Sequence, residues 1–108
     1  MEWIALTSME QLDEIQQAQQ KVMMFKHSTR CPISGMAKRG LEFDFDSVPE
    51  GTLLYFLDLI KYRDIPNAVA ERWGVRHESP QLLVLHEESC VYHASHEDVD
   101  MSEALKHL

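Results

Sequence analysis

The stretch that decides the fold is Phe25-Lys-His-Ser-Thr-Arg-Cys-Pro-Ile-Ser-Gly-Met-Ala37. It begins as the end of an apolar run, turns polar, and reaches a cysteine that is followed at once by a proline. Proline fixes φ near the helical value and lacks the N–H that the first turn of a helix leaves unpaired. The sequence therefore predicts a helix with Cys31 as its N-cap and Pro32 as its first residue.

The predicted helix continues beyond Pro32 with one apolar face and a natural stop. Apolar residues recur at near-helical spacing, which predicts that this face is buried. Gly40 suits the position after the end of a helix, so we expect the helix to end there. The apolar positions are Ile33, Met36, Ala37 and Leu41.

The position of Cys31 has chemical consequences. An N-cap side chain faces the free N–H groups of the next turn, here those of Ile33 and Ser34. The helix dipole and Arg30 add positive charge, and cysteines in such settings have pKa values of roughly 3.5–7.5 instead of about 8.5. The alternative is a buried structural cysteine. The polar residues at 26–30 favour an accessible loop, so we predict a reactive thiolate.

Composition limits the classes of protein to consider. A chain of 108 residues is long enough for one core, so we expect a single domain over residues 1–108. The net charge of −8 argues against nucleic acid or an anionic membrane as a partner. The first residues do not resemble a signal peptide, and the two cysteines, Cys31 and Cys90, suggest free thiols in a reducing compartment. We expect a cytoplasmic protein.

Periodicity and turn residues predict nine elements along the chain. Ser8 and Gln11 form a capping-box pattern before one helix, Gly74 closes another, and Asp100 with Glu103 caps the last. Residues 41–46 allow either an edge strand or an irregular return. The predicted strands are Trp3–Leu6, Lys21–Lys26, Leu53–Ile60, Gln81–Leu85 and Cys90–Ser95, and Pro66–Trp73 is a helix.

The resulting order is β-α-β-α-β-α-β-β-α. Strands that alternate with helices predict a parallel sheet, and the terminal hairpin extends it with antiparallel strands. The fold class is therefore α/β, with a mixed central sheet and helices on both faces. Lys21–Lys26 is apolar without alternation, as expected for a strand that is buried on both sides.

Two segments carry a resemblance to a known family. Phe-Lys-His-Ser-Thr-Arg-Cys-Pro-Ile-Ser (Phe25–Ser34) and Gly-Val-Arg-His-Glu-Ser-Pro-Gln (Gly74–Gln81) resemble the thioredoxin-like fold, and within it the monothiol bacilliredoxins of the Cys-Pro-Ile-Ser type. The resemblance covers the whole chain. One position differs, because Arg30 stands directly before the cysteine where we expect threonine.

The resemblance implies a function. It implies removal of bacillithiol, a small cytosolic thiol, from mixed disulfides on proteins, with bacillithiol as a co-substrate and no bound cofactor. Cys31 would attack the mixed disulfide and become bacillithiolated, and a second thiol would regenerate it. Dithiol oxidoreductases place a resolving cysteine at position 34, and Ser34 there implies a one-cysteine route.

The residues around Cys31 are candidates for substrate contact. Ser34 could donate to the thiolate or be a plain polar residue of the first turn, and Arg30 could meet carboxylates of the small thiol or be solvated. Pro32 adjoins the cysteine. The resemblance implies that the Ser79–Pro80 bond is cis, lies beside Cys31, and leaves the Ser79 backbone free to pair with substrate.

Other chemistry is less well supported. A Cys31–Cys90 disulfide is disfavoured, because the strand after Pro80 would carry Cys90 roughly 15–20 Å away. We expect Cys90 to be a structural thiol. His93 and His96 would point to opposite faces of a strand, and no cysteine–histidine pair has zinc spacing. An iron–sulfur cluster carrier like the monothiol glutaredoxins, and a redox-inert thioredoxin-like binding module, stay as alternatives.

Overall fold

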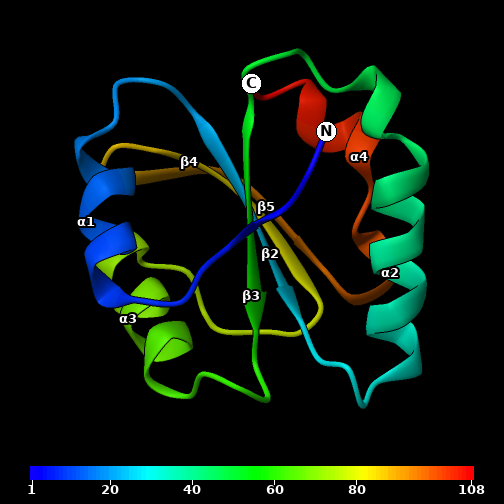
Figure 1. Ribbon diagram of the computed structural model, residues 1–108, viewed down its shortest axis with the longest axis horizontal. Coiled ribbons are helices and arrows are strands. Elements are labelled where there is room, and N and C mark those ends of the chain that lie inside the picture. Colours follow the sequence, from blue (N-terminus) through cyan, green and yellow to red (C-terminus); the bar gives the residue numbers. More distant parts are fainter.

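Five strands form one sheet in the order β1-β3-β2-β4-β5 in the computed structural model, which describes residues 1–108 (Figure 1). β1 and β2 both pair with β3 in parallel, whereas β4 is antiparallel to β2 and to β5. The strands are β1 (Ile4–Ala5), β2 (Val22–His27), β3 (Leu53–Asp58), β4 (Gln81–His86) and β5 (Ser89–Ser95). The helices are α1 (Met9–Gln17), α2 (Pro32–Phe43), α3 (Asp64–Trp73) and α4 (Met101–Leu105), with short 3₁₀ helices η1 (Phe45–Ser47) and η2 (His96–Asp98).

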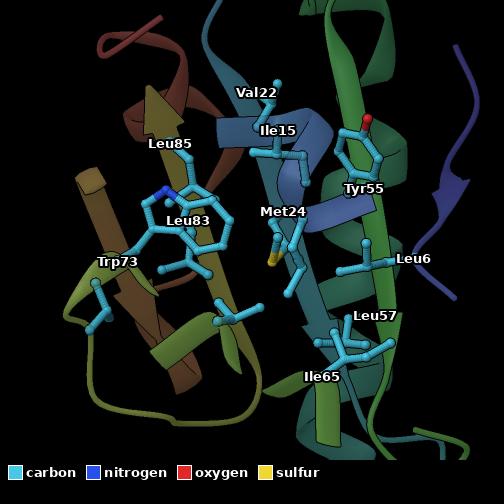
Figure 2. Packing of buried hydrophobic residues seen from close by; sticks show 13 residues of the cluster. Leu6, Ile15, Val22, Met24, Tyr55, Leu57, Ile65, Trp73, Leu83 and Leu85 are labelled. Carbon is cyan, nitrogen blue, oxygen red and sulfur yellow. The ribbon is translucent and has the colours of Figure 1, made fainter. Parts of the chain in front are cut away.

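The helices form two layers on the two faces of the sheet. Figure 1 shows α1 and α3 on one side and α2 and α4 on the other. Each side has its own apolar cluster, and Figure 2 shows the larger one, of 13 buried residues, between the sheet and the α1/α3 layer. Met24 and Leu83 contribute to it from the sheet and Trp73 from α3. The α/β class, the mixed sheet and the element order are as predicted.

β2 is the centre of this arrangement. It is hydrogen-bonded to β3 on one side and to β4 on the other, so Met24 lies level with both Tyr55 and Leu83. All six of its residues are buried, as predicted for a strand that is covered on both sides, although its last two residues, Lys26 and His27, are polar. β2, β3 and β4 bring the loops before α2, before α3 and before β4 to one edge of the sheet, at the bottom of Figure 1.

α2 differs from the prediction in its length and in its buried face. It continues through Gly40 to Phe43, with Asp44 as its C-cap. Gly40 in a helix costs about 1 kcal/mol relative to alanine, and burial of Leu41 against the sheet offsets that cost. The buried side chains are those of Ser34 and Leu41, whereas Ile33 is 44% exposed and Met36 64% exposed. The predicted inward direction of Ile33 and Met36 is therefore wrong.

Three smaller features also differ from the prediction. Residues 41–46 do not form a strand, since they complete α2 and enter η1. α3 begins at Asp64 instead of Pro66, because the first four N–H groups of a helix need no intrahelical partner and proline is tolerated at the third position. Glu103 does not complete the cap of α4: Asp100 alone accepts from the Ser102 N–H, and Glu103 pairs with Lys106.

The other turn signals are confirmed. Gly74 ends α3 with a left-handed φ of 65°. The Ser8 N–H donates to Gln11 Oε1 at 3.1 Å at the start of α1. Even α2, the longest helix at 12 residues, is shorter and less apolar than a helix that crosses a membrane.

One charged residue lies fully inside the molecule. Lys26, in β2, has no exposed surface, and its Nζ lies 3.2 Å from His77 Nδ1 in the loop before β4. Burial lowers the pKa of Lys26 to about 8, and the opposing effects of Cys90 and Glu78 are smaller. Lys26 and His77 therefore tie the end of the central strand to the loop that leads into β4.

We predict that Lys26→Met changes how stability depends on pH. The pKa of Lys26 is about 8 in the folded chain, whereas that of an unburied lysine is 10.5, so the unfolded chain binds more protons between these pH values. The free energy of unfolding of the natural protein should therefore rise over this interval by roughly 3 kcal/mol more than that of Lys26→Met. Denaturant unfolding at a series of pH values measures the difference.

The control for this experiment is Lys61→Met, which removes an exposed lysine. Its unfolding free energy should follow that of the natural protein at every pH. Parallel curves for the natural protein and Lys26→Met would contradict the prediction.

Candidate active site

The structure confirms Cys31 as the N-cap of α2. Its backbone is extended, with φ −105° and ψ 117°, and its carbonyl accepts the first helical hydrogen bond from the Gly35 N–H at 3.1 Å. The Cys31 N–H donates to the Ser28 carbonyl at 3.2 Å and closes a tight turn after β2. Pro32 follows as the first helical residue. The sequence folds this way because the extended N-cap and the fixed φ of proline match the start of a helix.

The thiol of Cys31 is free and partly exposed. Its sulfur accepts no capping hydrogen bond, so the two N–H contacts expected from Ile33 and Ser34 are not formed. A thiol sulfur is a weak acceptor, which explains why it does not act as a serine or aspartate cap would. The sulfur therefore stands at the positive end of the helix dipole without a partner inside the protein.

Ser34 is held from the strand side. Its side chain is fully buried, and its Oγ accepts from the Ser28 N–H at 3.0 Å. The same oxygen lies 2.7 Å from Nδ1 of His27, the last residue of β2. Of the two sequence-based interpretations of Ser34, donation to the thiolate does not occur here, because its hydrogen-bond partners are His27 and Ser28.

His27 sits in a largely aromatic pocket beneath α2. It is nearly buried, and its ring lies 5.9 Å from the ring of Phe25 and 5.4 Å from that of Phe56. Burial and then the charge of Lys38 lower the pKa of His27, while the contact with Ser34 and the more distant Asp58 and Glu42 act in the opposite direction. His27 is therefore neutral at pH 7.

Ser79 and Pro80 lie at the same edge of the sheet. The Ser79–Pro80 bond is cis, as the resemblance implied. Lys26 pairs with Gln81 across β2 and β4, so the same antiparallel register continued by one residue places Pro80 opposite His27. The Pro80 carbonyl accepts from the His96 N–H, whereas the backbone of Ser79 makes no backbone hydrogen bond. The Ser79 backbone is therefore free.

The approach to Cys31 is less polar than its sequence suggests. Lys26 and His27 belong to the buried strand, so the exposed part begins only after Ser28. Arg30 is exposed and has no ion-pair partner, and Pro32 is exposed beside it. An accessible loop carries Cys31, as predicted. Lys26 does not belong to that loop, so its use as evidence for the loop was wrong.

A groove adjoins the start of α2. Its volume is about 340 Å³, and α2 forms one wall while η2 and the residue after it form the other. Apolar side chains dominate the lining, and Glu97 and His96 add polar groups on the η2 side. The lining residues are Ile33, Met36, Ala37, His96, Glu97 and Val99. The exposed apolar side chains of α2 therefore line a groove whose first residue, Ile33, comes two positions after Cys31.

Cys90 lies outside this site. It is free, packs beside the α1/α3 core, and its sulfur donates to the Tyr92 carbonyl at 3.2 Å. Burial raises its pKa, with smaller opposing effects of Tyr92 and Lys26. These contacts agree with a structural thiol. The structure contains no group of three or more cysteine, histidine or acidic residues arranged to hold a metal ion.

The sequence interpretation missed His27 and the η2 side of the groove. Side chains alternate between the two faces of a strand, so His27 lies on the same face of β2 as Phe25, toward α2. The sequence alone could therefore have predicted which face His27 occupies. The contact with Ser34 also depends on how α2 is rotated about its axis. No local pattern marked His96 or Glu97, because the chain returns to α2 only after the β4–β5 hairpin.

Comparisons with known proteins agree with this geometry. The family model described as "Monothiol bacilliredoxin BrxC" matches residues 4–104. A solved structure described provisionally as an oxidoreductase with a thioredoxin fold is similar over 95% of this chain and 90% of that chain, with 28% identity and a TM-score of 0.82. The thioredoxin of Malassezia sympodialis (Mala s 13) has 18% identity and a TM-score of 0.73, over 95% of this chain and 88% of that one. The thioredoxin of Trypanosoma brucei brucei has 13% identity and a TM-score of 0.75, over 97% and 88%.

We predict that Ser34→Ala destabilises the protein. The change removes the only side-chain partner of His27 Nδ1 and of the Ser28 N–H, which lie in a region with little access to water. Leaving these groups unpaired should cost about 1–3 kcal/mol of unfolding free energy. Ser102→Ala is the matched control, since the Ser102 hydroxyl contacts only the exposed Asp100 carboxylate. Equal losses in the two variants would show that the Ser34 contacts contribute nothing special.

Proposed function

The chain belongs to the monothiol bacilliredoxin family, and on that premise we propose that it removes bacillithiol from protein mixed disulfides through Cys31. Its fold is the thioredoxin-like fold of thiol oxidoreductases. One observation carries the proposal: a single free thiol stands at the N-terminus of α2, and the residue three positions later is serine. Only one protein thiol is therefore available for the reaction at the start of α2.

The reaction proceeds by two thiol–disulfide exchanges. The Cys31 thiolate attacks the bacillithiol sulfur of the mixed disulfide, a new disulfide bond forms, and the substrate protein leaves as a thiolate that takes up a proton. A second thiol, such as free bacillithiol, then attacks the bacillithiol sulfur bound to Cys31. This step releases oxidised bacillithiol and restores the Cys31 thiolate. Each step breaks one disulfide bond and forms another. The reduction of the substrate protein is therefore balanced by the oxidation of bacillithiol, and no other oxidant or reductant is needed.

Several features support attack by Cys31. The Cys31 sulfur lies at the positive end of the α2 dipole, and the neighbouring Arg30 is exposed. The sulfur is not engaged by another group of the protein. Ser34 has no thiol and is already hydrogen-bonded to His27 and Ser28, so nothing in the chain competes to resolve the bacillithiolated state.

The surroundings of Cys31 suit a protein substrate. The free N–H and carbonyl of Ser79 can pair with an extended segment of the substrate, in the manner of an added strand. The groove between α2 and η2 can receive an apolar side chain near the modified cysteine. Arg30 is free to meet a carboxylate of bacillithiol. Because bacillithiol is a cytosolic thiol, the proposed place of action is the cytoplasm.

We predict that only Cys31 gains an adduct. Incubation with oxidised bacillithiol should add the mass of one bacillithiol to the natural protein and to Cys90→Ser, and none to Cys31→Ser. The reason lies in the surroundings of the two thiols: the Cys31 sulfur has no partner in the protein, whereas Cys90 packs beside the α1/α3 core and its sulfur donates to the Tyr92 carbonyl. Intact-mass spectrometry followed by peptide mapping measures this. An adduct that remains in Cys31→Ser would contradict the assignment.

We predict that Met36→Glu slows the reaction with protein substrates. A carboxylate in an apolar wall beside Glu97 should disfavour docking, with about a tenfold loss of kcat/KM on a bacillithiolated protein. The rate with the small disulfide of bacillithiol and cysteine should change much less, because that substrate does not fill the groove. Val91→Glu, on the exposed side of β5, is the control. Equal losses on both substrates would argue against protein docking in the groove.

A further inference from the structure

The loops at the Cys31 edge of the sheet differ in charge from the rest of the chain. They are residues 28–31 after β2, 59–63 after β3 and 74–80 before β4, and they meet at the bottom of Figure 1. These loops contain four of the ten lysine and arginine residues but only one of the 18 acidic residues. The edge is therefore positive on a chain whose net charge is −8.

The four cations of these loops have no acidic partner. All four are exposed and none takes part in an ion pair, whereas Lys38, Arg72 and Lys106 in or beside the helices are each paired with a carboxylate. Charges without a partner inside the protein are available to an anion outside it. We call these four residues the basic rim: Arg30, Lys61, Arg63 and Arg76.

Hydrogen bonds hold the three loops side by side. The Leu59 N–H donates to the His27 carbonyl at 3.0 Å, and the Arg76 carbonyl accepts from Gln81 Nε2 at 3.1 Å, where Gln81 pairs with Lys26 of β2. Neighbouring strands lie about 5 Å apart, so the ends of β3, β2 and β4 span about 10 Å. Three residues of an extended chain cover about the same distance. One short segment can therefore reach more than one cation of the basic rim.

The acidic side chains near this edge do not cancel the basic rim. The Asp58 carboxylate accepts from two backbone N–H groups of the loop at 59–63. Glu78, the one acid within the loops, accepts from Ser95 Oγ at 3.0 Å. Asp64 stands in the first turn of α3, where the helix dipole favours a negative charge. Even with Asp58 and Asp64 included, the edge has more basic than acidic residues.

The two faces of the sheet differ in charge at this edge. The loop that carries Lys61 and Arg63 leads into α3, on one face. On the other face η2 lies against α2 and exposes Glu97 and Asp98. A charged partner is therefore attracted on the α3 side and repelled or attracted in the opposite sense on the η2 side, which fixes its orientation.

We propose that the basic rim is the docking surface for an acidic, extended segment of the protein substrate, with its acidic residues on the α3 side of the modified cysteine. This inference rests on the proposed function and names the class of substrate for it. Opposite charges speed the encounter of the two proteins, and salt weakens this effect. A nucleic acid fits less well, because a long polyanion would also meet the acidic remainder of the chain.

The experiment measures attack by Cys31 without bacillithiol. Each of three peptides holds one cysteine as a mixed disulfide with thionitrobenzoate, with a run of aspartates before the cysteine, a run after it, or serines on both sides. The Cys31 thiolate attacks the peptide sulfur, a disulfide between peptide and protein forms, and thionitrobenzoate leaves as a coloured thiolate. All proteins carry Cys90→Ser. Rates are divided by the rate with iodoacetamide, which is uncharged, so that any change in the thiol itself cancels.

One of the two aspartate peptides should react about three- to tenfold faster than the serine peptide at low salt. The advantage should disappear between about 0.01 M and about 1 M salt, which shortens the Debye length from about 30 Å to about 3 Å. Lys61→Gln combined with Arg63→Gln should abolish it as well. Arg30 stays unchanged, because it adjoins Cys31 in the chain.

The matched control is Arg39→Gln combined with Lys106→Gln, which removes the same charge from exposed positions outside the three loops. It should keep most of the advantage. Equal rates for all three peptides, or equal losses in the two double variants, would overturn the proposal. So would an equal loss with the disulfide of bacillithiol and cysteine, which would assign Lys61 and Arg63 to the small thiol. Binding of a single-stranded oligonucleotide that is tighter than binding of the aspartate peptide and depends on the same two residues would also overturn it. Failure of the bacillithiol adduct experiment would leave the peptide result unchanged.

Discussion

The pairing of β2 on both of its sides is the constraint on which the rest of the structure depends. β2 bonds in parallel to β3 and antiparallel to β4, and a helical layer covers each of its faces. A strand in this position has no contact with water. A shift of one residue in register would turn each side chain to the opposite face and separate Lys26 and His27 from their partners. This rigid strand ends at His27, four residues before Cys31. The place of the thiol is therefore set by the best-fixed element of the fold.

The last two residues of β2 depart from its apolar pattern, and the departure has a consequence on each face. Lys26 points toward the α1/α3 side and contacts His77, in the loop before Pro80. His27 points toward α2 and contacts Ser34. Burial of two polar side chains is unfavourable unless each has a partner. The partners are His77, in the loop before β4, and Ser34, in α2. These contacts offset the cost of burying Lys26 and His27, and they hold both segments to the end of β2.

The sequence predicted the elements well where the signal is local. Gly74 ends α3 because its left-handed φ suits glycine, and β3 forms from Leu53 because its first five residues are uniformly apolar. The prediction failed at Gly40, where the local signal for a stop competes with the burial of Leu41, which only the folded sheet supplies. Cys31 and Pro32 were found from local rules. The partner of Ser34 was not, since it depends on the rotation of α2 against β2.

The contact between Ser34 and His27 also bears on why this site has one thiol. A resolving cysteine at position 34 would replace a small hydroxyl that is a strong donor and acceptor with a larger thiol that is weak at both. The Ser28 N–H and His27 Nδ1 would then lose good partners inside a closely packed region. Serine at this position is thus part of the buried polar network that shapes the turn before α2. The one-cysteine chemistry and the stability of that turn depend on the same hydroxyl, so a change to a two-cysteine site would also require a new partner for His27.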